Sequence, residues 1–398
     1  MLTLLLDLDD TLLDTNMDAF IPAYFRAFSA HLAQQISPDV MLPALIAGTR
    51  AMTASQDPSR TLRQVFDEKF YPSIGLSRDS LTPRIEEFYD HIFPDLGRLT
   101  GQRPEAVDLV QWAFGQGYRV GIATDPLFPR KATLHRLRFA GLPEDNNPFA
   151  LISSYENFHF TKSHAAYFAE FLGRLGWPDG PVLMVGNDAV RDLAPARDLG
   201  LATYWVTADA PQPSDPESTG RGSLADLRAW LQSVDLKQLE PQFNTRESIL
   251  SLLTAAPASI SSLLLEMPAA HWNVRPAPVE WSFTEVLCHL RDTELEIHQP
   301  RLQRVMVEDE PFLAAQMTND WAEARHYREQ DGHLAFKDYL KARIATLEIL
   351  NRLTDLDWPR KARHSIFGPT TMQELVKFMA THDRIHIQQI WSLLHPPG

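Results

Sequence analysis

Three polar side chains follow the first apolar run of the chain, and their types suit the transfer of a phosphoryl group. In the run LLLDLDDTLLD, Asp7, Asp9 and Thr11 stand after residues 2–6. Phosphoryl transfer depends mainly on charge neutralisation and in-line positioning, and side chains of these types suit both. A polar turn after a strand has a similar composition, so the interpretation depends on what accompanies these residues.

Polar residues of the required kinds also follow three later apolar runs. Thr124 ends RVGIATD, Lys162 lies in FTKSH, and Asp188 and Asp192 lie in LMVGNDAVRD. Because ligands of open α/β sheets bind outside the carboxyl ends of the strands, these side chains are predicted to meet at one edge. In this order the four segments resemble the motifs of the haloacid dehalogenase superfamily, and the resemblance covers about residues 1–235.

The resemblance implies a role for each matching residue. Asp7 is the expected nucleophile, which forms an aspartyl-phosphate, and Asp9 is the expected general acid and base. Thr124 is expected to bind the phosphoryl oxygens, and Lys162 to offset their charge and orient the nucleophile. True dehalogenases lack the second acid, so its presence favours a phosphatase that acts on a small phosphorylated molecule.

Magnesium is the cofactor that this resemblance implies. Its expected ligands are Asp7, the backbone carbonyl of Asp9, and Asp188, with Asp192 in support, since hard oxygen ligands suit this ion. Many relatives have an acid directly after the glycine of the last motif, where this chain has Asn187. A neutral amide is a weak magnesium ligand, which favours Asp188, but both registers stay open.

Two residues beside these motifs complicate the interpretation. Asp125 follows Thr124 where an Asn is common, and an additional carboxylate there could repel phosphate. Lys131 is an alternative to Lys162, and the weaker one because it begins a helix soon after the preceding strand.

The elements that must position these residues alternate between strands and helices up to about residue 207. The apolar runs predict strands at 2–6, 118–123, 149–153, 181–185 and 202–206. Helical spacing of apolar residues predicts helices at 105–116, 130–139, 163–175 and 190–199. This alternation predicts an α/β, doubly wound parallel sheet of the Rossmann-like kind. Residues 15 to about 100 contain helical segments only, so we interpret them as an insertion after the first strand. The resemblance implies that this insertion is the mobile cap of the family.

The second half of the chain has a different pattern. Residues 208–222 have the composition of a loop, and a helix at 224–234 is expected to close a first domain of residues 1–235. After a linker at 236–243, residues 244–398 are predicted to form an all-α four-helix bundle. Its expected helices are 247–267, 283–307, 334–353 and 372–394.

Local signals define these helices further. Capping boxes predict that two of them begin after Ser282 and Thr371, each followed three residues later by a Glu. Pro300 should kink the second helix or divide it. The connections at about 308–333 and 355–370 are long for a bundle, and such loops often carry function.

Histidines in this half could bind a transition metal. His382 and His386 stand four residues apart on one face of the last helix, and His289 lies on the second. Three imidazoles can form an open metal site, although such a pair also arises easily in a chain with 14 His. The helix opening Glu280-Trp281-Ser282 and the segment HDRIHIQQ resemble the DinB-like metal-binding four-helix bundles over about residues 243–395. Zinc, nickel and iron(II) all suit neutral imidazoles.

Two other functions remain open for the bundle. It could carry the main chemistry, as a metal-dependent transferase that uses a thiol or as a hydrolase. It could instead be a nonenzymatic dimerisation or sensing module, which would give a homodimer through the bundle. Gln388 stands where synthase-type relatives tend to have a Glu, which argues against a synthase. Cys288 points away from His289 on the helix, so we interpret Cys288 as a packing residue.

Composition narrows the location and partners of the chain. A net charge of −14 disfavours nonspecific binding to nucleic acid and to anionic membranes. One cysteine in 398 residues excludes an internal disulfide and favours a reducing compartment. We find neither a basic leader nor an uninterrupted apolar run near the roughly 18 residues of a membrane span, so a cytoplasmic protein is expected.

Overall fold

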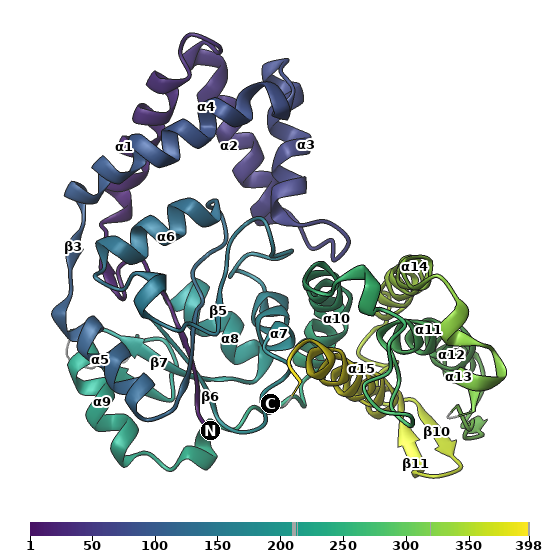
Figure 1. The fold of residues 1–398 in the computed structure, drawn as a ribbon. Coiled ribbons are helices and arrows are strands. Elements are labelled where there is room, and N and C mark those ends of the chain that lie inside the picture. Colours follow the sequence, from purple (N-terminus) through teal and green to yellow (C-terminus); the bar gives the residue numbers. More distant parts are fainter. Residues whose placement is uncertain (209–211, 213, 319, 397–398) are drawn as a thin grey trace. The chain divides into compact units, whose positions relative to one another are not determined.

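The computed structural model describes residues 1–208, 212, 214–318 and 320–396, in two compact units (Figure 1). The first unit contains Met1–Phe171 and Pro178–Gln242, and the second contains Leu172–Trp177 and the chain from Phe243 onward.

A six-stranded parallel sheet forms the centre of the first unit, as the alternating pattern predicted. Its strand order is β5-β4-β1-β6-β7-β8. The bounds are β1 Thr3–Leu6, β4 Arg119–Ile122, β5 Leu151–Ile152, β6 Val182–Gly186, β7 Ala202–Val206 and β8 Gly220–Gly222. In the central strand, Leu6 is in register with both Ile122 and Val185. The residues that follow these three strands therefore leave the sheet at the same edge.

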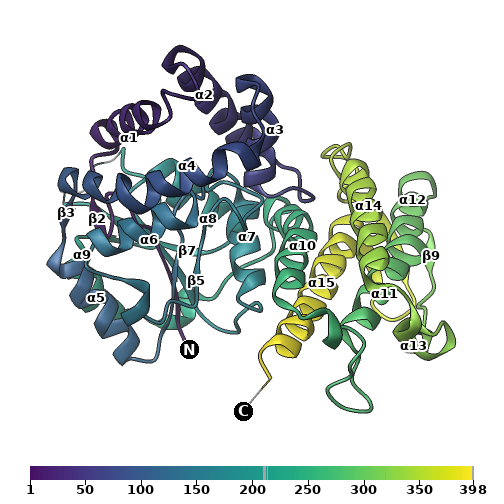
Figure 2. The ribbon, with the colours of Figure 1, turned by 45° about the horizontal axis from the view of Figure 1, so that its top comes forward.

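Helices cover both faces of this sheet (Figures 1 and 2). They are α5 Pro104–Gly115, α6 Arg130–Phe139, α7 Ala165–Arg174, α8 Ala194–Leu199 and α9 Leu224–Ser233. Helices α5, α6 and α9 share one hydrophobic core with Val120 and Ile122 of β4. Gly121 between them faces the other side, where a Cβ would lie 2.7 Å from the ring of Phe171 in α7. The doubly wound class is therefore confirmed.

One strand of the sheet was not predicted. Gly220–Gly222 pairs with β7 within the segment expected to be a loop, of which residues 209–211 and 213 lie outside the described residues. A Gly-Arg-Gly sequence has no β propensity of its own, so the exposed edge of β7 supplies the pairing.

A helical insertion follows the first strand. It contains α1 Met17–His31, α2 Pro38–Ala54, α3 Leu62–Ile74, α4 Arg78–His91 and a 3₁₀ turn at Phe93–Leu99. Its own hydrophobic core includes Phe20, Phe28 and Phe88. A two-stranded antiparallel ribbon, β2 Leu13–Asp14 with β3 Gly101–Gln102, joins the two ends of the insertion to the sheet.

The second unit is a helical bundle. Its helices are α10 Arg246–Glu266, α11 Phe283–Thr293, α12 Gln299–Val307, α13 Trp321–Ala324, α14 Gly332–Leu350 and α15 Met372–Leu394. Both predicted capping boxes are present, at Ser282 and at Thr371. A π-helical turn at Glu294–His298 separates α11 from α12, directly before Pro300, which confirms the predicted division.

The long connections of the bundle are not loops throughout. β9 Phe312–Leu313, β10 Lys361–His364 and β11 Gly368–Thr371 form a three-stranded sheet, where the sequence indicated no strand. The sequence KARH in β10 alternates exposed and buried residues, but Arg and His hide this alternation from a hydrophobicity pattern.

Helix α10 is long and apolar enough to cross a membrane by length and composition alone. Of its most apolar 18-residue window, 67% is buried inside the protein. The core helix of a bundle has these same properties.

Candidate functional sites

The first candidate site lies at the carboxyl edge of the parallel sheet, where Lys162 connects two acids. Asp7 follows β1 directly, and its backbone N–H donates to the carbonyl of Val185 (3.0 Å). The Lys162 Nζ lies 2.6 Å from Asp7 Oδ1 and also forms an ion pair with Asp192. All three side chains are buried. Residues separated by more than 150 positions thus converge, as predicted.

The segment after β6 brings two more polar groups to this edge. The Asp192 carboxylate accepts the Asp188 N–H (2.9 Å), and Asp188 Oδ1 accepts the N–H groups of Val190 (2.8 Å) and Arg191 (3.1 Å). Asp188 therefore caps a helical turn with one carboxylate oxygen. The Asn187 side-chain oxygen accepts the Thr11 hydroxyl (3.1 Å).

Asp9 lies against a buried arginine that the sequence analysis did not identify. Arg136 of α6 is 1% exposed and forms an ion pair with Asp9, whose other oxygen accepts the Thr15 hydroxyl (3.2 Å). The guanidinium also lies 4.5 Å from the centre of the Phe128 ring. Arg136 shares its helix face with Thr133 and Leu137, so a cation on an otherwise buried face was the available signal.

The two ambiguous residues of this half have defined partners. Asp125 accepts the backbone N–H of Lys162 (3.3 Å) and lies 3.5 Å from an Arg191 nitrogen, so cationic and N–H groups offset its charge. Lys131 contacts Asp90 (2.8 Å) and Glu86 of α4 instead of Asp7. Thr124 is buried at the end of β4, where it lines the same cavity as the acids.

The electrostatics of this site keep the Lys162 ammonium charged and favour protonation of the buried acids. Burial raises the pKa of Asp9, which Arg136 offsets only in part. Burial alone would lower the pKa of Lys162, but the carboxylates of Asp192 and Asp7 raise it above its usual value. Burial, together with the Asp7 charge, raises the pKa of Asp192.

The same cluster has the donor set of a hard divalent cation. Carboxylate or amide oxygens of Asp7, Asn187, Asp188 and Asp192 all line one end of a single cavity. Magnesium prefers such oxygen ligands and keeps several waters, for which the cavity has room. The side chains present therefore fit the expected metal.

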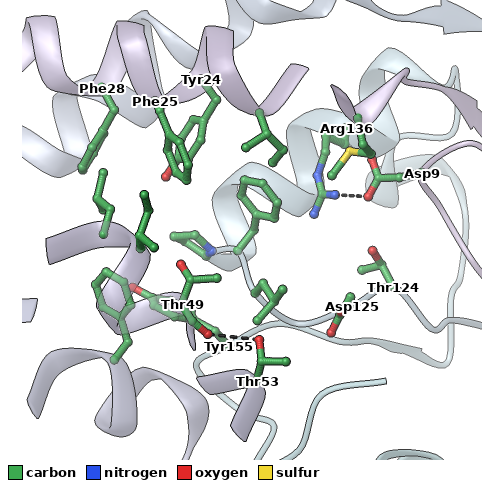
Figure 3. Close-up of a pocket in the computed structure, with 18 of the residues that line it drawn as sticks. Asp9, Tyr24, Phe25, Phe28, Thr49, Thr53, Thr124, Asp125, Arg136 and Tyr155 are labelled. Atoms are coloured by element: carbon green, nitrogen blue, oxygen red, sulfur yellow. Dashed lines mark hydrogen bonds and ion pairs between the residues drawn. The ribbon is translucent and has the colours of Figure 1, made fainter. Parts of the chain in front are cut away.

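A cavity of about 980 Å³ extends from these acids to the helical insertion. Figure 3 shows Tyr24, Phe25 and Phe28 of α1 on one side of it and Thr124 and Asp125 on the other. The insertion thus covers the site, as expected of a cap.

The second candidate site brings three histidines of the bundle together. His382 Nε2 lies 3.0 Å from His289 Nε2 and 3.2 Å from His386 Nε2, and one nitrogen of each ring lies within 4.8 Å of the others. Two of these residues come from α15 and one from α11. Three imidazole nitrogens this close together can serve as ligands of one metal ion.

Neighbouring side chains orient these imidazoles, and burial favours their neutral form. His386 Nδ1 lies 3.0 Å from Gln389 Oε1, which leaves Nε2 as the acceptor when Nδ1 donates. The Trp281 ring stacks on His386 at 6.0 Å and lies 4.8 Å from His289. Burial lowers the pKa of His289 to about 3 and that of His386 to about 4.

A fourth histidine, which the sequence analysis missed, adjoins this cluster. The His298 ring lies 5.5 Å from that of His382, and burial lowers its pKa to about 4. Nine residues of regular α-helix would leave His298 about half a turn from His289. The wider π turn reduces this rotation, so helical spacing alone could not reveal the neighbour.

A buried ion network lies next to the histidines. Arg343 of α14 binds Glu294 through two nitrogens (3.0 and 2.7 Å) and also forms an ion pair with Asp383, the residue after His382. All three charged side chains are at most 2% exposed. Cys288 instead lies 3.9 Å from the Tyr327 carbonyl and outside the histidine cluster, which supports packing as its role.

Comparisons with known proteins agree with this division. The family model of haloacid dehalogenase-like hydrolases matches residues 1–200, and that of the DinB superfamily matches residues 252–390. The chain is 23% identical over 129 residues to the uncharacterized protein YuaE of Bacillus subtilis, a match that covers 30% of this chain and 80% of YuaE.

Two solved structures illustrate the likeness of each half. A HAD phosphatase from Thermococcus onnurineus is 19% identical, with a TM-score of 0.39, over 58% of this chain and 98% of that one. YfiT from Bacillus subtilis, described as "a probable metal-dependent hydrolase with an unusual four-helix bundle topology", is 18% identical, with a TM-score of 0.35, over 41% of this chain and 89% of that one. Since the first family model spans half of the 398 residues, the chain belongs to the haloacid dehalogenase-like hydrolases and carries a DinB-superfamily bundle as a second domain.

Proposed function

We propose that the first domain, residues 1–235, is a magnesium-dependent phosphohydrolase that acts on a small phosphorylated metabolite through an aspartyl-phosphate. The observation that carries this proposal is the buried Lys162 held between Asp7 and Asp192. A fixed ammonium beside a carboxylate offsets the charge of a phosphoryl group and keeps the carboxylate oriented toward it.

The proposed reaction has two steps. In the first, an Asp7 oxygen attacks phosphorus, the bond between phosphorus and the ester oxygen breaks, and Asp9 gives its proton to that oxygen. In the second, Asp9 takes a proton from water, whose oxygen attacks phosphorus and breaks the bond to Asp7. The raised pKa of Asp9 favours the protonated acid that the first step requires.

Asp7, the Asp9 carbonyl and Asp188 would hold magnesium, with Asp192 in support. The bound ion would offset the charge of the phosphoryl oxygens. Thr124 is proposed to donate a hydrogen bond to one of these oxygens from the end of β4.

Phosphate release from a panel of phosphate esters, with and without magnesium, tests this function. Asp7→Asn keeps the shape of the side chain but removes the nucleophile, so we expect no measurable turnover. Asp14→Asn is the matched control, because Asp14 is exposed on β2 and does not line the cavity. Persistent turnover in the Asp7 variant would refute the proposal.

We also propose that the bundle binds one transition metal, zinc, nickel or iron(II), through His289, His382 and His386. The convergence of their nitrogens within 4.8 Å favours this second function. An open position on such a metal suits water or a thiol, so a metal-dependent hydrolase or thiol transferase is the alternative main activity.

Metal content of the intact chain tests the second proposal. We expect about one bound metal per chain, lost in His382→Ala and retained in His326→Ala, whose side chain is 74% exposed. Full loading of a variant that lacks all three histidines would exclude the site.

A further inference from the structure

The cavity above the acids has an aromatic wall that phosphoryl transfer itself does not require. The wall includes Tyr24, Phe25 and Phe28 of α1 and Tyr155 after β5 (Figure 3). Tyr89 of α4 also lines it. These residues come from the cap and from the loops that face it, so they lie where the leaving group of a bound ester would extend.

The rings of this wall support one another. The Tyr24 ring centre lies 5.5 Å from that of Phe25, 5.9 Å from that of Phe28 and 5.4 Å from that of Phe128. Such contacts fix the rings before a ligand binds, so little side-chain freedom is lost on binding.

Two tyrosine hydroxyls of the wall and a neighbouring threonine hydroxyl already have partners inside the protein. The hydroxyls of Tyr24 and Tyr89 bond to each other (2.9 Å), and the Thr53 hydroxyl donates to the Thr49 carbonyl (3.1 Å). A sugar or polyol placed against this wall would exchange its bonds to water for contacts with carbon, which is unfavourable. A ring system would gain from the same contacts.

A continuous path connects the wall to the reacting acids. Arg136 contacts Asp9 on one side and the Phe128 ring on the other, and Phe128 packs against Tyr24. With phosphorus at Asp7 and the ester oxygen at Asp9, the rest of the ester would pass Phe128 toward α1. The cavity volume of about 980 Å³ is at the upper end of the roughly 300–1,000 Å³ typical of organic ligands.

We propose that the substrate is a phosphate monoester of an alcohol or phenol whose body is an extended, apolar ring system seated against this wall. The inference rests on the proposed phosphohydrolase function and specifies its substrate class.

Two esters of primary alcohols test the inference with similar leaving groups, naphthylmethyl phosphate and glycerol-1-phosphate. In the intact, magnesium-supplied enzyme we expect kcat/KM to be at least about tenfold higher for the naphthylmethyl ester, the gain expected from aromatic contacts. Phe25→Ala should remove most of this preference, because it should lower kcat/KM for the naphthylmethyl ester several times more than kcat/KM for glycerol phosphate.

Two further variants make the test specific. Phe25→Leu retains apolar contact and should restore part of the preference even if the Ala variant folds poorly. Phe114→Ala removes a half-buried ring of α5 outside the cavity and should retain the full preference. Equal or better hydrolysis of glycerol phosphate would overturn the substrate class but leave the phosphohydrolase function intact. Absence of magnesium-dependent hydrolysis of both esters and of every other ester in the panel would overturn both proposals.

Discussion

The two sites differ in how each keeps polar groups buried. At the sheet edge, Lys162 stays charged between carboxylates, and the oxygen-rich surroundings suit a hard cation. In the bundle, burial keeps His289 and His386 neutral, and the charged network of Arg343 lies beside them. Neutral nitrogens suit a borderline transition metal, so the donor groups of the two sites differ in the kind of metal that they would prefer.

Among substitutions that alter the difference between the two sites, we expect the largest loss of stability at Arg343. Arg343→Met leaves Glu294 and Asp383 buried without their cation, which should lower the free energy of unfolding of the bundle by about 3–5 kcal/mol. Urea unfolding followed by hydrogen exchange in α14 and α15 measures this change. Arg352→Met is the control, since its side chain is 78% exposed, and an equal loss there would contradict the role of burial.

Acid should destabilise the metal-free bundle through its histidines. The pKa of His289, about 3, and that of His386, about 4, lie below the ordinary 6.5, so between these values the unfolded chain binds more protons. The contribution of these imidazoles to the free energy of unfolding is therefore fully present above pH 6.5 and decreases as the pH falls toward 4. At pH 5 the loss is about 1–2 kcal/mol per imidazole. Hydrogen exchange of α15 at pH 7.5 and 5.0, with chelator present, checks the direction. His386→Gln should reduce the dependence, and an unchanged profile would argue against neutral burial.

At the first site, the matching experiment concerns Arg136. Its guanidinium lowers the pKa of Asp9 against the effect of burial, so Arg136→Met should raise that pKa further. Because Asp9 must hold a proton to act as an acid, the alkaline limb of the kcat/KM profile should move to higher pH. We expect a loss of about tenfold in kcat near neutrality from poorer positioning of Asp9. A lower kcat with an unmoved alkaline limb would point to a structural role alone.

The smallest effect is expected at Cys288. Burial raises the pKa of its thiol to about 11, so iodoacetamide at pH 8 should react at least about 100-fold more slowly with folded protein than with protein in urea. Because the thiol lies outside the histidine cluster, adding metal should not change the rate. A slower reaction of Cys288 with iodoacetamide in the presence of metal would instead indicate that the thiol is a metal ligand, so that the second site would no longer contain nitrogen ligands alone.

Sequence could predict what depends on neighbours along the chain. Apolar strands with acids at their ends predicted the sheet and the meeting of Asp7 with Lys162, and a four-residue spacing predicted His382 beside His386. Residues whose role depends on tertiary contacts escaped prediction. The clearest are Arg136, which looks like one more cation in a basic helix, and His298, whose direction depends on a π turn.

Strand β8 and the sheet of β9, β10 and β11 were not predicted from the sequence for a related reason. Their pairing partners, rather than their own residues, give them extended structure, and a hydrophobicity pattern carries no information about a partner that is distant in sequence.

The ribbon of β2 and β3 has a consequence for how this enzyme could acquire new specificity. Leu13 pairs with Gln102 and Asp14 with Gly101, so the chain leaves the sheet domain and returns to it at adjacent positions. For the sheet, the whole cap is equivalent to a hairpin loop, and the entropy of closing a loop depends only weakly on its length. A cap of another size could therefore be recombined at these two points, giving a different cavity wall over unchanged acids at the sheet edge.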